Sequence, residues 1–307
     1  MRFSDRPGVL MSNATQALFA NRWLPVFLVT PLALLIVFFF YVPIIEALYW
    51  SFFLERPFGG GSIFVGWGNF ARVLSDPQFW EAGRRTITFT VIGSTLAVLI
   101  PLILAVAADR KVRSARPAQN VLVWPKGIAG ASIGVVFAYI FNPFVGVLAP
   151  LNQLFPGLWA PGIHGADAFT MLILAYVWSG IPFNFVILLA GLQSVPHTLH
   201  QAAAMDGAGP WRRIFEIQLP LIMPQLLLTL VLEFTDSITS AFALVDTITQ
   251  GGPGGATTLL VYKIYTDGFI GYDLSGAATQ TALLMVFVIL LTSAQFALLG
   301  RRINYER

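Results

Sequence analysis

Six long apolar runs constrain this chain more than any other feature of its sequence. Each is about 20 residues long or more, the length an α-helix needs to cross the ~30 Å hydrocarbon core of a bilayer. They occupy residues 23–50, 86–108, 118–141, 168–192, 221–245 and 277–299. Only 11% of the 307 residues are charged, against roughly a quarter in a soluble domain. Because backbone groups in lipid must hydrogen bond within the protein, the sequence predicts an all-α polytopic membrane protein with six transmembrane helices.

Basic residues divide unevenly between the connections that join these runs. One set of connections and termini holds twelve, namely Arg2, Arg6, Arg22, Arg110, Lys111, Arg113, Arg116, Arg212, Arg213, Arg301, Arg302 and Arg307. The other set holds five, namely Arg56, Arg72, Arg84, Arg85 and Lys263. Lys and Arg accumulate on the cytoplasmic side of a membrane, so both termini are predicted to be cytoplasmic.

The expected organisation follows from this orientation. A cytoplasmic tail covers residues 1–22, a six-helix transmembrane domain covers 23–300, and a second cytoplasmic tail covers 301–307. The connection at 197–220, between the fourth and fifth runs, then lies in the cytoplasm. The predicted location is the inner (plasma) membrane, crossed several times.

This 197–220 connection has the sequence of a structured element. Gln201 to Met205 is rich in Ala and predicts a short helix, which residues 206–209 end. Pro210 suits the first position of a second helix, expected over about 211–218 and ended by Leu219-Pro220. The apolar surface of this second helix would consist of Trp211, Ile214, Phe215 and Ile217.

The connection resembles the coupling motif, or EAA loop, of bacterial ABC importer permeases, in which E-A-A-x-x-x-D-G-A is followed by an I-x-L-P segment. The matching residues here are Ala202, Ala203, Asp206, Gly207, Ala208, Phe215, Ile217, Leu219 and Pro220. Gln201 occupies the first position, where the motif has Glu. The resemblance implies that these ten residues transmit ATP hydrolysis in a partner into movement of the transmembrane helices.

The resemblance extends over nearly the whole chain, to the carbohydrate-type branch of these permeases. It includes Phe64-Val65-Gly66, Phe141-Asn142-Pro143 and Gly251-Gly252-Pro253. It implies a second homologous permease subunit, two ATP-binding subunits and an extracytoplasmic substrate-binding protein as partners, within a lipid bilayer and without nucleic acid. The implied cargo is sn-glycerol-3-phosphate or a glycerophosphodiester.

No nucleotide site is expected in this chain. A P-loop requires a Lys after Gly to hold phosphates, and none of Lys111, Lys126 and Lys263 follows a Gly. ATP and Mg would therefore belong to the partner subunits, and the chain is expected to be a transporter subunit that binds no cofactor and no metal. Residues 130–134 match G-x-S-x-G around Ser132, a hydrolase pattern, but no His is expected at that depth. Gly130 and Gly134 are better explained as a helix-packing face.

Two groups of polar residues are candidates for the substrate path. Charges within membrane spans are usually functional, and Glu233 and Asp236 lie three residues apart on the fifth run. The alternative is a structural ion pair, for example with Lys126. In the fourth run, Trp178 to Pro182 is expected to break the helix near Ser179 and Asn184, either beside a cavity or as a packing kink.

The sequence leaves two classes of cargo open, an anionic one and a neutral one. An anionic cargo favours basic groups along its path, whereas this chain offers Glu233 and Asp236. Either the partner permease supplies positive charge, or the cargo is a neutral sugar or polyol. A different class, an ion-coupled secondary transporter, would use the two acids for coupling and would have no need of the 197–220 motif.

Overall fold

The computed structural model describes residues 23–56, 60–109 and 127–300, with side chains up to Ala297. Both predicted tails, the basic residues between 110 and 116, and Lys126 therefore lie outside the described residues. Two units make up the chain, one ending at Tyr49 and the other beginning at Trp50.

The first unit contains one long apolar helix. It consists of α1 (Leu24–Ile36), the π-helical turn η1 (Val37–Tyr41) and α2 (Val42–Trp50), whose last residue belongs to the second unit. The helix continues through Pro31, and α1, η1 and α2 contain no buried residue. Its length and apolar composition are those of a membrane-crossing helix.

The second unit is helical apart from one β-hairpin. In chain order its elements are β1 (Phe53–Glu55), β2 (Ser62–Phe64), α3 (Gly68–Leu74), α4 (Pro77–Asp109), α6 (Gly130–Ile140), α7 (Ala149–Leu154), α8 (Gly165–Ser194), α9 (His197–Met205), α10 (Pro210–Arg213), η3 (Ile214–Gln218), α11 (Leu219–Leu221), α12 (Met223–Thr239), α13 (Ala241–Ile248), α14 (Leu260–Tyr265), η4 (Thr266–Ile270) and α15 (Leu274–Gly300). The strands pair antiparallel, with Leu54 opposite Ile63.

Local sequence explains where the long helices begin. The Asp76 carboxylate accepts a hydrogen bond from the Gln78 N–H, and Pro77 fills the first helical position of α4. The Asp273 carboxylate accepts from the Gly276 N–H at the start of α15 in the same way. Both helices therefore begin at an acidic cap.

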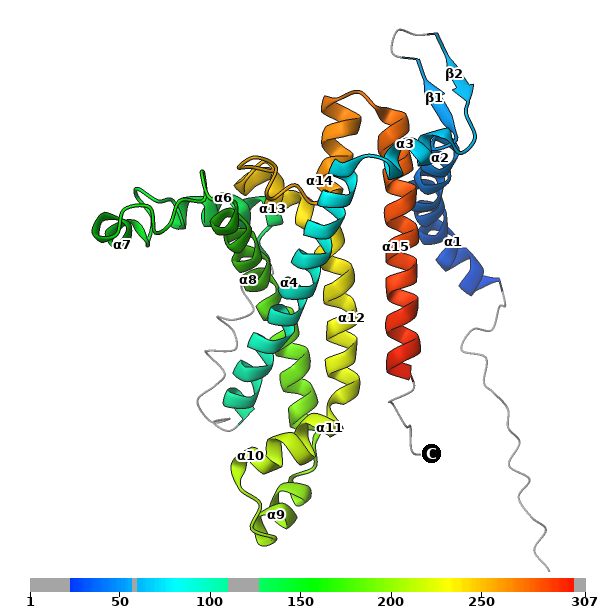
Figure 1. The fold of residues 1–307 in the computed structure, drawn as a ribbon. Coiled ribbons are helices and arrows are strands. Elements are labelled where there is room, and N and C mark those ends of the chain that lie inside the picture. Colours follow the sequence, from blue (N-terminus) through cyan, green and yellow to red (C-terminus); the bar gives the residue numbers. More distant parts are fainter. Residues whose placement is uncertain (1–22, 57–59, 110–126, 301–307) are drawn as a thin grey trace, which may run out of the picture. The chain divides into compact units, whose positions relative to one another are not determined.

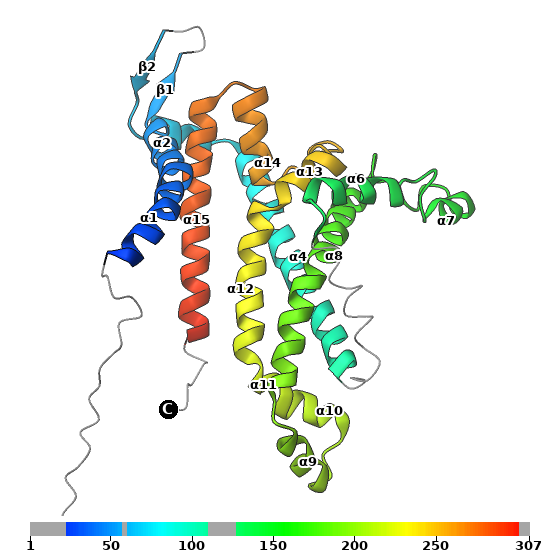
Figure 2. The same cartoon turned by 180° about the vertical axis from the view of Figure 1, so that it is seen from behind.

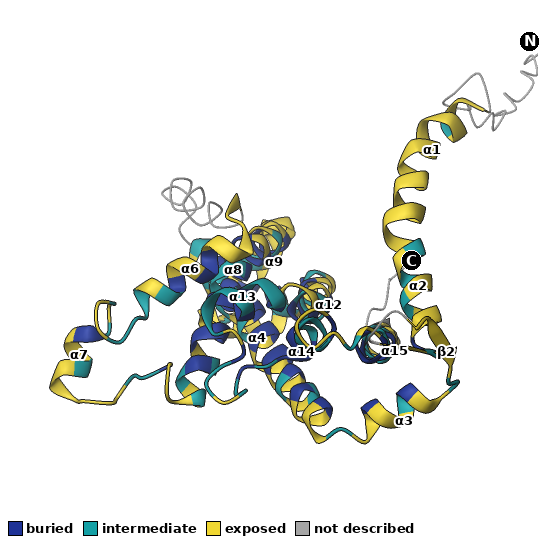
Figure 3. Cartoon of the chain, turned by 90° about the horizontal axis from the view of Figure 1, so that it is seen from above, coloured by how far each residue is buried: buried dark blue, intermediate teal, exposed yellow. Residues whose placement is uncertain are grey.

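The core of this unit lies where α4, α8 and α12 pack together (Figures 1 and 2). Phe89, Leu172 and Tyr176 form one buried cluster with residues of α13, and Phe185 and Leu188 form another nearer the 197–221 loop. Viewed along the helices, buried positions concentrate at this junction, whereas α7 is largely exposed (Figure 3). Because lipid is as apolar as these side chains, close packing rather than exclusion of water favours their association.

Four described helices are long and apolar enough to cross a membrane, or five if the bent pair Pro210–Leu221 and Met223–Thr239 counts as one. Of the predicted run 118–141, the structure describes only residues 127–141, which contain the 11-residue helix α6. The predicted run 221–245 divides into α12 and α13 at Ser240. Six spans with cytoplasmic termini thus stay a prediction.

The predicted packing face on α6 is confirmed. A Cβ at Gly130 would meet the Ala243 Cβ at 3.5 Å, and one at Gly134 would overlap the Thr247 side chain. Both partners belong to α13, which packs against α6. The G-x-S-x-G pattern is therefore explained by helix packing.

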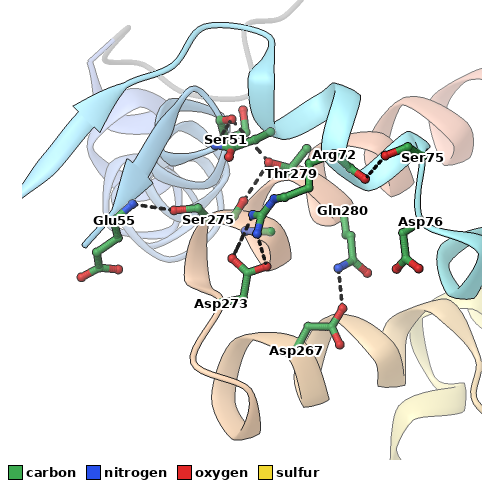
Figure 4. A network of polar contacts seen from close by, with 12 residues as sticks. Ser51, Glu55, Arg72, Ser75, Asp76, Asp267, Asp273, Ser275, Thr279 and Gln280 are labelled. Carbon is green, nitrogen blue, oxygen red and sulfur yellow. Dashed lines mark hydrogen bonds and ion pairs between the residues drawn. The ribbon is translucent and has the colours of Figure 1, made fainter. Parts of the chain in front are cut away.

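A polar network joins separate segments at the end of the unit that is remote from the 197–221 loop (Figure 4). Lys263 Nζ lies 2.9 Å from Asp267 Oδ2 and 3.2 Å from Asp76 Oδ2. Gln280 Nε2 donates to Asp267 Oδ2 at 2.7 Å, and the exposed pair of Arg72 and Asp273 lies beside it. Burial alone would lower the pKa of Lys263, but the hydrogen bonds and charges of Asp267 and Asp76 outweigh it and raise that pKa. These contacts fix α14 and η4 to the starts of α4 and α15.

Candidate functional site

The 197–221 loop forms a helical hairpin that projects beyond the ends of the long helices (Figure 1). Its first helix, α9, ends at Met205, and Gly207 follows with a φ of +72°. The Gly207 N–H donates to Ala204 O at 3.2 Å, and the Ala208 N–H donates to Ala203 O at 2.9 Å. This is a Schellman turn, whose left-handed position favours glycine. The D-G-A segment of the sequence motif is thus the turn that separates the two helices.

The second helix of the hairpin carries exposed aromatic side chains. Trp211 is 69% exposed and Phe215 is 61% exposed, and their rings stack with centroids 6.3 Å apart. On α9, Met205 is 84% exposed, although Ala203 is buried. Ile214 was predicted to share the apolar surface of Trp211 and Phe215, but it is buried, with 5% of its surface exposed. The exposed surface is therefore narrower and more aromatic than the sequence predicted.

One hydrogen bond ties the hairpin to a long helix. Gln218 is buried, and its Nε2 donates to Asp109 Oδ2 at 3.2 Å. Asp109 is the last residue of α4. The hairpin is therefore linked to α4 by this contact and to α12 by the continuity of the chain.

The predicted end of the second helix at Leu219-Pro220 is wrong. The helical segment runs through Pro220 to Leu221, and the bend of 69° falls at Ile222. Pro220 lies within this helical segment, one residue before its last residue, Leu221. Ile222, 1% exposed, anchors the bend in the core beside Phe185.

A second candidate group surrounds Glu233 between α4, α8 and α12. Glu233 Oε2 accepts from the Tyr176 hydroxyl at 2.7 Å, and Glu233 Oε1 accepts from Asn184 Nδ2 at 2.7 Å. Asn184 Nδ2 also donates to Ala97 O, and Ser94 Oγ donates to Glu233 O. Glu233 is 6% exposed. Glu233 thus connects α12 to both neighbouring helices inside the core, to α8 through its carboxylate and to α4 through its backbone carbonyl.

Asp236, three residues further along, has different surroundings. It lines a hollow of about 280 Å³ between α6, α8, α12 and α13, together with Ser179 and Ser240. Ser240 Oγ donates to Asp236 Oδ1 at 2.8 Å. The structure therefore brings Ser179 and Asp236 together and joins Asn184 to Glu233. Trp178 belongs to neither group, because its ring packs on Phe137 in the core.

The predicted break at Trp178 to Pro182 is also wrong. Helix α8 runs without interruption from Gly165 to Ser194, with Pro182 inside it. Gly180 allows α4 and α12 to approach, since a Cβ there would lie 3.3 Å from both Ala97 Cβ and Glu233 Oε1. Pro182 has no N–H to donate within α8, and the packing of α4 and α12 against α8 keeps the helix continuous at that position.

Sequence reasoning missed Tyr176 and Ser240. Tyr176 lies one turn before Ser179 and two turns before Asn184, so the α-helical period would have placed all three on one side of the fourth run. Ser240 follows Asp236 by four residues, which is also one turn.

His197 and His200, with ring centroids 6.3 Å apart, belong to no group of three or more potential metal ligands among the described side chains.

Sequence comparisons establish the family to which this chain belongs. Residues 10–305 match the family model described as "Binding-protein-dependent transport system inner membrane component". The chain belongs to this family, the permeases of ABC importers, and is a multi-pass protein of the inner membrane. It is a transporter subunit and not an enzyme.

Curated relatives match this chain along almost its full length. It is 39% identical over 288 residues to the "sn-glycerol-3-phosphate transport system permease protein UgpA" of Brucella abortus, covering 94% of this chain and 98% of the relative. The protein with the same description from Pectobacterium atrosepticum is 37% identical over 294 residues, covering 96% of this chain and 100% of the relative.

Solved structures share the fold at lower sequence identity. A chain of a bacterial ABC transporter involved in the import of the acidic polysaccharide alginate has a TM-score of 0.78 and 20% identity, covering 91% of this chain and 96% of that one. A chain of the MetNI methionine ABC transporter has a TM-score of 0.55 and 18% identity, covering 75% of this chain and 100% of that one. Both support the ABC permease fold.

Proposed function

We propose that this chain translocates sn-glycerol-3-phosphate, or a glycerophosphodiester, across the inner membrane as one permease of an ABC importer. The similarity at 39% identity over 94% of the chain to a protein described as an sn-glycerol-3-phosphate permease supports this cargo. ATP hydrolysis, with its Mg, belongs to separate subunits. The partners are a second homologous permease, two ATP-binding subunits and an extracytoplasmic binding protein.

The 197–221 hairpin is the part that engages an ATP-binding subunit. The observation that carries this assignment is the exposed, stacked pair of Trp211 and Phe215 on a helical hairpin that projects from the long helices. Aromatic side chains that pack into a pocket of a partner are typical anchors of protein interfaces. Gln201, Ala202 and Asp206 are exposed on α9 and its turn and would contribute to the same contact.

The hairpin acts as a lever because it is fixed at its base. The hydrogen bond from Gln218 to Asp109 and the buried side chains of Ile214 and Ile222 hold that base against the long helices. Movement of the ATP-binding subunit then rotates α4 and α12 together, which shifts the permease between inward-facing and outward-facing packings. In this arrangement both termini are cytoplasmic and the chain crosses the membrane six times.

The hollow beside Asp236 is the part of the substrate path that this chain contributes. Ser179 and Asp236 face it, and a carboxylate there repels an anion. The second permease would then supply the positive charge for a phosphate group. A neutral sugar or polyol, whose hydroxyl groups donate to carboxylates, is the alternative cargo that this hollow favours.

Uptake of labelled sn-glycerol-3-phosphate in cells with and without this chain tests the cargo. Unlabelled glycerophosphocholine and common disaccharides serve as competitors. We expect uptake to require the chain, to be reduced by glycerophosphocholine and to be unaffected by disaccharides. Uptake that is normal without the chain would move the cargo to a neutral sugar or polyol, while membership in the importer family would stand.

A further inference from the structure

A groove of about 390 Å³ opens between α4, α14 and α15, at the end of α4 remote from the 197–221 hairpin. Its floor is apolar and belongs to the core, with Phe79 7% exposed and Leu260 6% exposed. Residues of α15 such as Leu284 and Phe287 form one wall. The volume is in the range of small-molecule sites, and the groove is independent of the hollow beside Asp236.

The rim of the groove is at the edge of the apolar run of α4, where lipid headgroups are expected. Helix α4 has 33 residues, which correspond to about 50 Å at 1.5 Å per residue and exceed the ~30 Å hydrocarbon core. The apolar run begins at residue 86, so Trp80 and Arg84 on the rim lie just outside it. The Trp80 indole N–H donates to Leu74 O at 2.8 Å, and Trp is typical of the membrane interface.

The rim offers one cation that other described side chains leave unpaired. Arg84 is exposed, and within the described ranges its guanidinium makes no ion pair or hydrogen bond. The neighbouring Arg85 differs, because its Nη2 lies 2.8 Å from Glu81 Oε2. A guanidinium at headgroup depth, above an apolar groove, matches a phosphate ester that carries hydrocarbon chains.

We propose that this groove binds one phospholipid of the extracytoplasmic leaflet, with an acyl chain in the groove and the phosphate on Arg84. An acyl chain gains little by moving from lipid to an apolar groove, since both surroundings are hydrocarbon. The selective contact is therefore the one between phosphate and Arg84. Gly83 keeps the groove open, since a Cβ added there meets no atom within 4 Å.

Photolabelling of the complete transporter in vesicles tests the site. The probe is phosphatidylglycerol with a photoreactive group in one acyl chain, and the labelled peptides are mapped by mass spectrometry. We expect label on residues 74–88 and 283–287, and its loss in Gly83→Leu, whose side chain fills the groove. Arg84→Gln should reduce the label about fivefold, the ratio equivalent to the ~1 kcal/mol of one basic residue near an anionic surface. Arg85→Gln is the matched control and should leave the label unchanged.

Two results would overturn the proposal. Label spread evenly over all lipid-facing helices, and insensitive to both Gly83→Leu and Arg84→Gln, would mean ordinary surrounding lipid. Labelling absent from the groove, with a cysteine at Thr88 cross-linking to another protein segment, would mean that a helix covers it. If Gly83→Leu fails to assemble, the comparison of Arg84→Gln with Arg85→Gln decides alone.

Discussion

Gln218 Nε2 lies 3.2 Å from Asp109 Oδ2, which joins the base of the 197–221 hairpin to the last residue of α4. These two residues are 109 positions apart in sequence. In the lever proposed above, this hydrogen bond is the contact through which α4, in addition to α12, follows the hairpin.

Replacing Gln218 by Ala should therefore weaken coupling. A hydrogen bond to a charged group contributes about 1.5–3 kcal/mol, so we expect uptake to fall about tenfold or more while ATP hydrolysis by the assembled transporter continues. The measurement is the ratio of cargo transported to ATP hydrolysed in proteoliposomes. Glu216→Gln is the control, because among the described side chains Glu216 pairs with Arg212 at an exposed position. An unchanged ratio in Gln218→Ala would exclude the lever.

Gly207→Asp should also uncouple hydrolysis from uptake while the chain still inserts. A Cβ at Gly207 meets no described atom within 4 Å, so the added side chain projects toward a partner that approaches the turn, while the φ of +72° adds backbone strain. Asp tolerates the positive φ better than most residues. The same transport-to-hydrolysis ratio is measured, with Gly209→Asp for comparison. Equal losses in both variants would indicate general crowding of the hairpin, and full uptake in Gly207→Asp would remove the coupling assignment.

The hydrogen bond from Tyr176 to Glu233 should stabilise the packing of α8 on α12. We expect Tyr176→Phe to lower the free energy of unfolding by about 2 kcal/mol, because a buried carboxylate oxygen loses a donor. Thermal unfolding of the purified transporter in detergent measures this loss. Thr239→Ala, at an exposed position of α12, is the control. An unaltered midpoint together with altered cargo selectivity in Tyr176→Phe would instead assign this group to the substrate path.

Asp236→Asn should reveal the charge of the cargo through the direction of its effect. Removing a carboxylate about 4 Å from an anion relieves roughly 1 kcal/mol of repulsion in a hydrated path, so KM for sn-glycerol-3-phosphate should fall about fivefold. For a neutral sugar or polyol the loss of an acceptor should raise KM. Asp246→Asn on α13 is the charge-matched control. If neither cargo responds, Asp236 is not part of the path.

Lys263 should contribute to stability through Asp76 and Asp267. Its side chain is 7% exposed, so Lys263→Met leaves two carboxylates without their cation, at a cost of about 2 kcal/mol after allowance for the partial exposure of both acids. Because the pKa of Lys263 is raised from 10.5, this contribution is fully present below pH 10.5 and is lost as the pH rises through the raised value. The thermal unfolding midpoint is measured for Lys263→Met and for the control Arg72→Gln, which removes the cation of the exposed Arg72–Asp273 pair. Equal small shifts would contradict a specific role for Lys263.

Local sequence gave reliable predictions where the physical cause is local. The end of the first hairpin helix at residues 206–209, the start of the second at Pro210 and the packing glycines of α6 all depend on the residue itself and its near neighbours. The break predicted around Pro182 and the helix end predicted at Pro220 failed for a common reason. Proline removes one hydrogen-bond donor, and whether the helix continues depends on the neighbouring elements that pack against it.

The sequence by itself determined that this is a helical membrane protein with two short helices in the connection between its fourth and fifth apolar runs, because hydropathy, length and turn residues act along the chain. Only the tertiary structure decided the different surroundings of the two acids, which sequence spacing had placed on one side of a helix. Glu233 meets Tyr176 and Asn184 of α8 in the core, whereas Asp236 faces a hollow with Ser240. Burial and hydrogen bonding depend on which helices pack together, and that packing joins residues far apart in sequence.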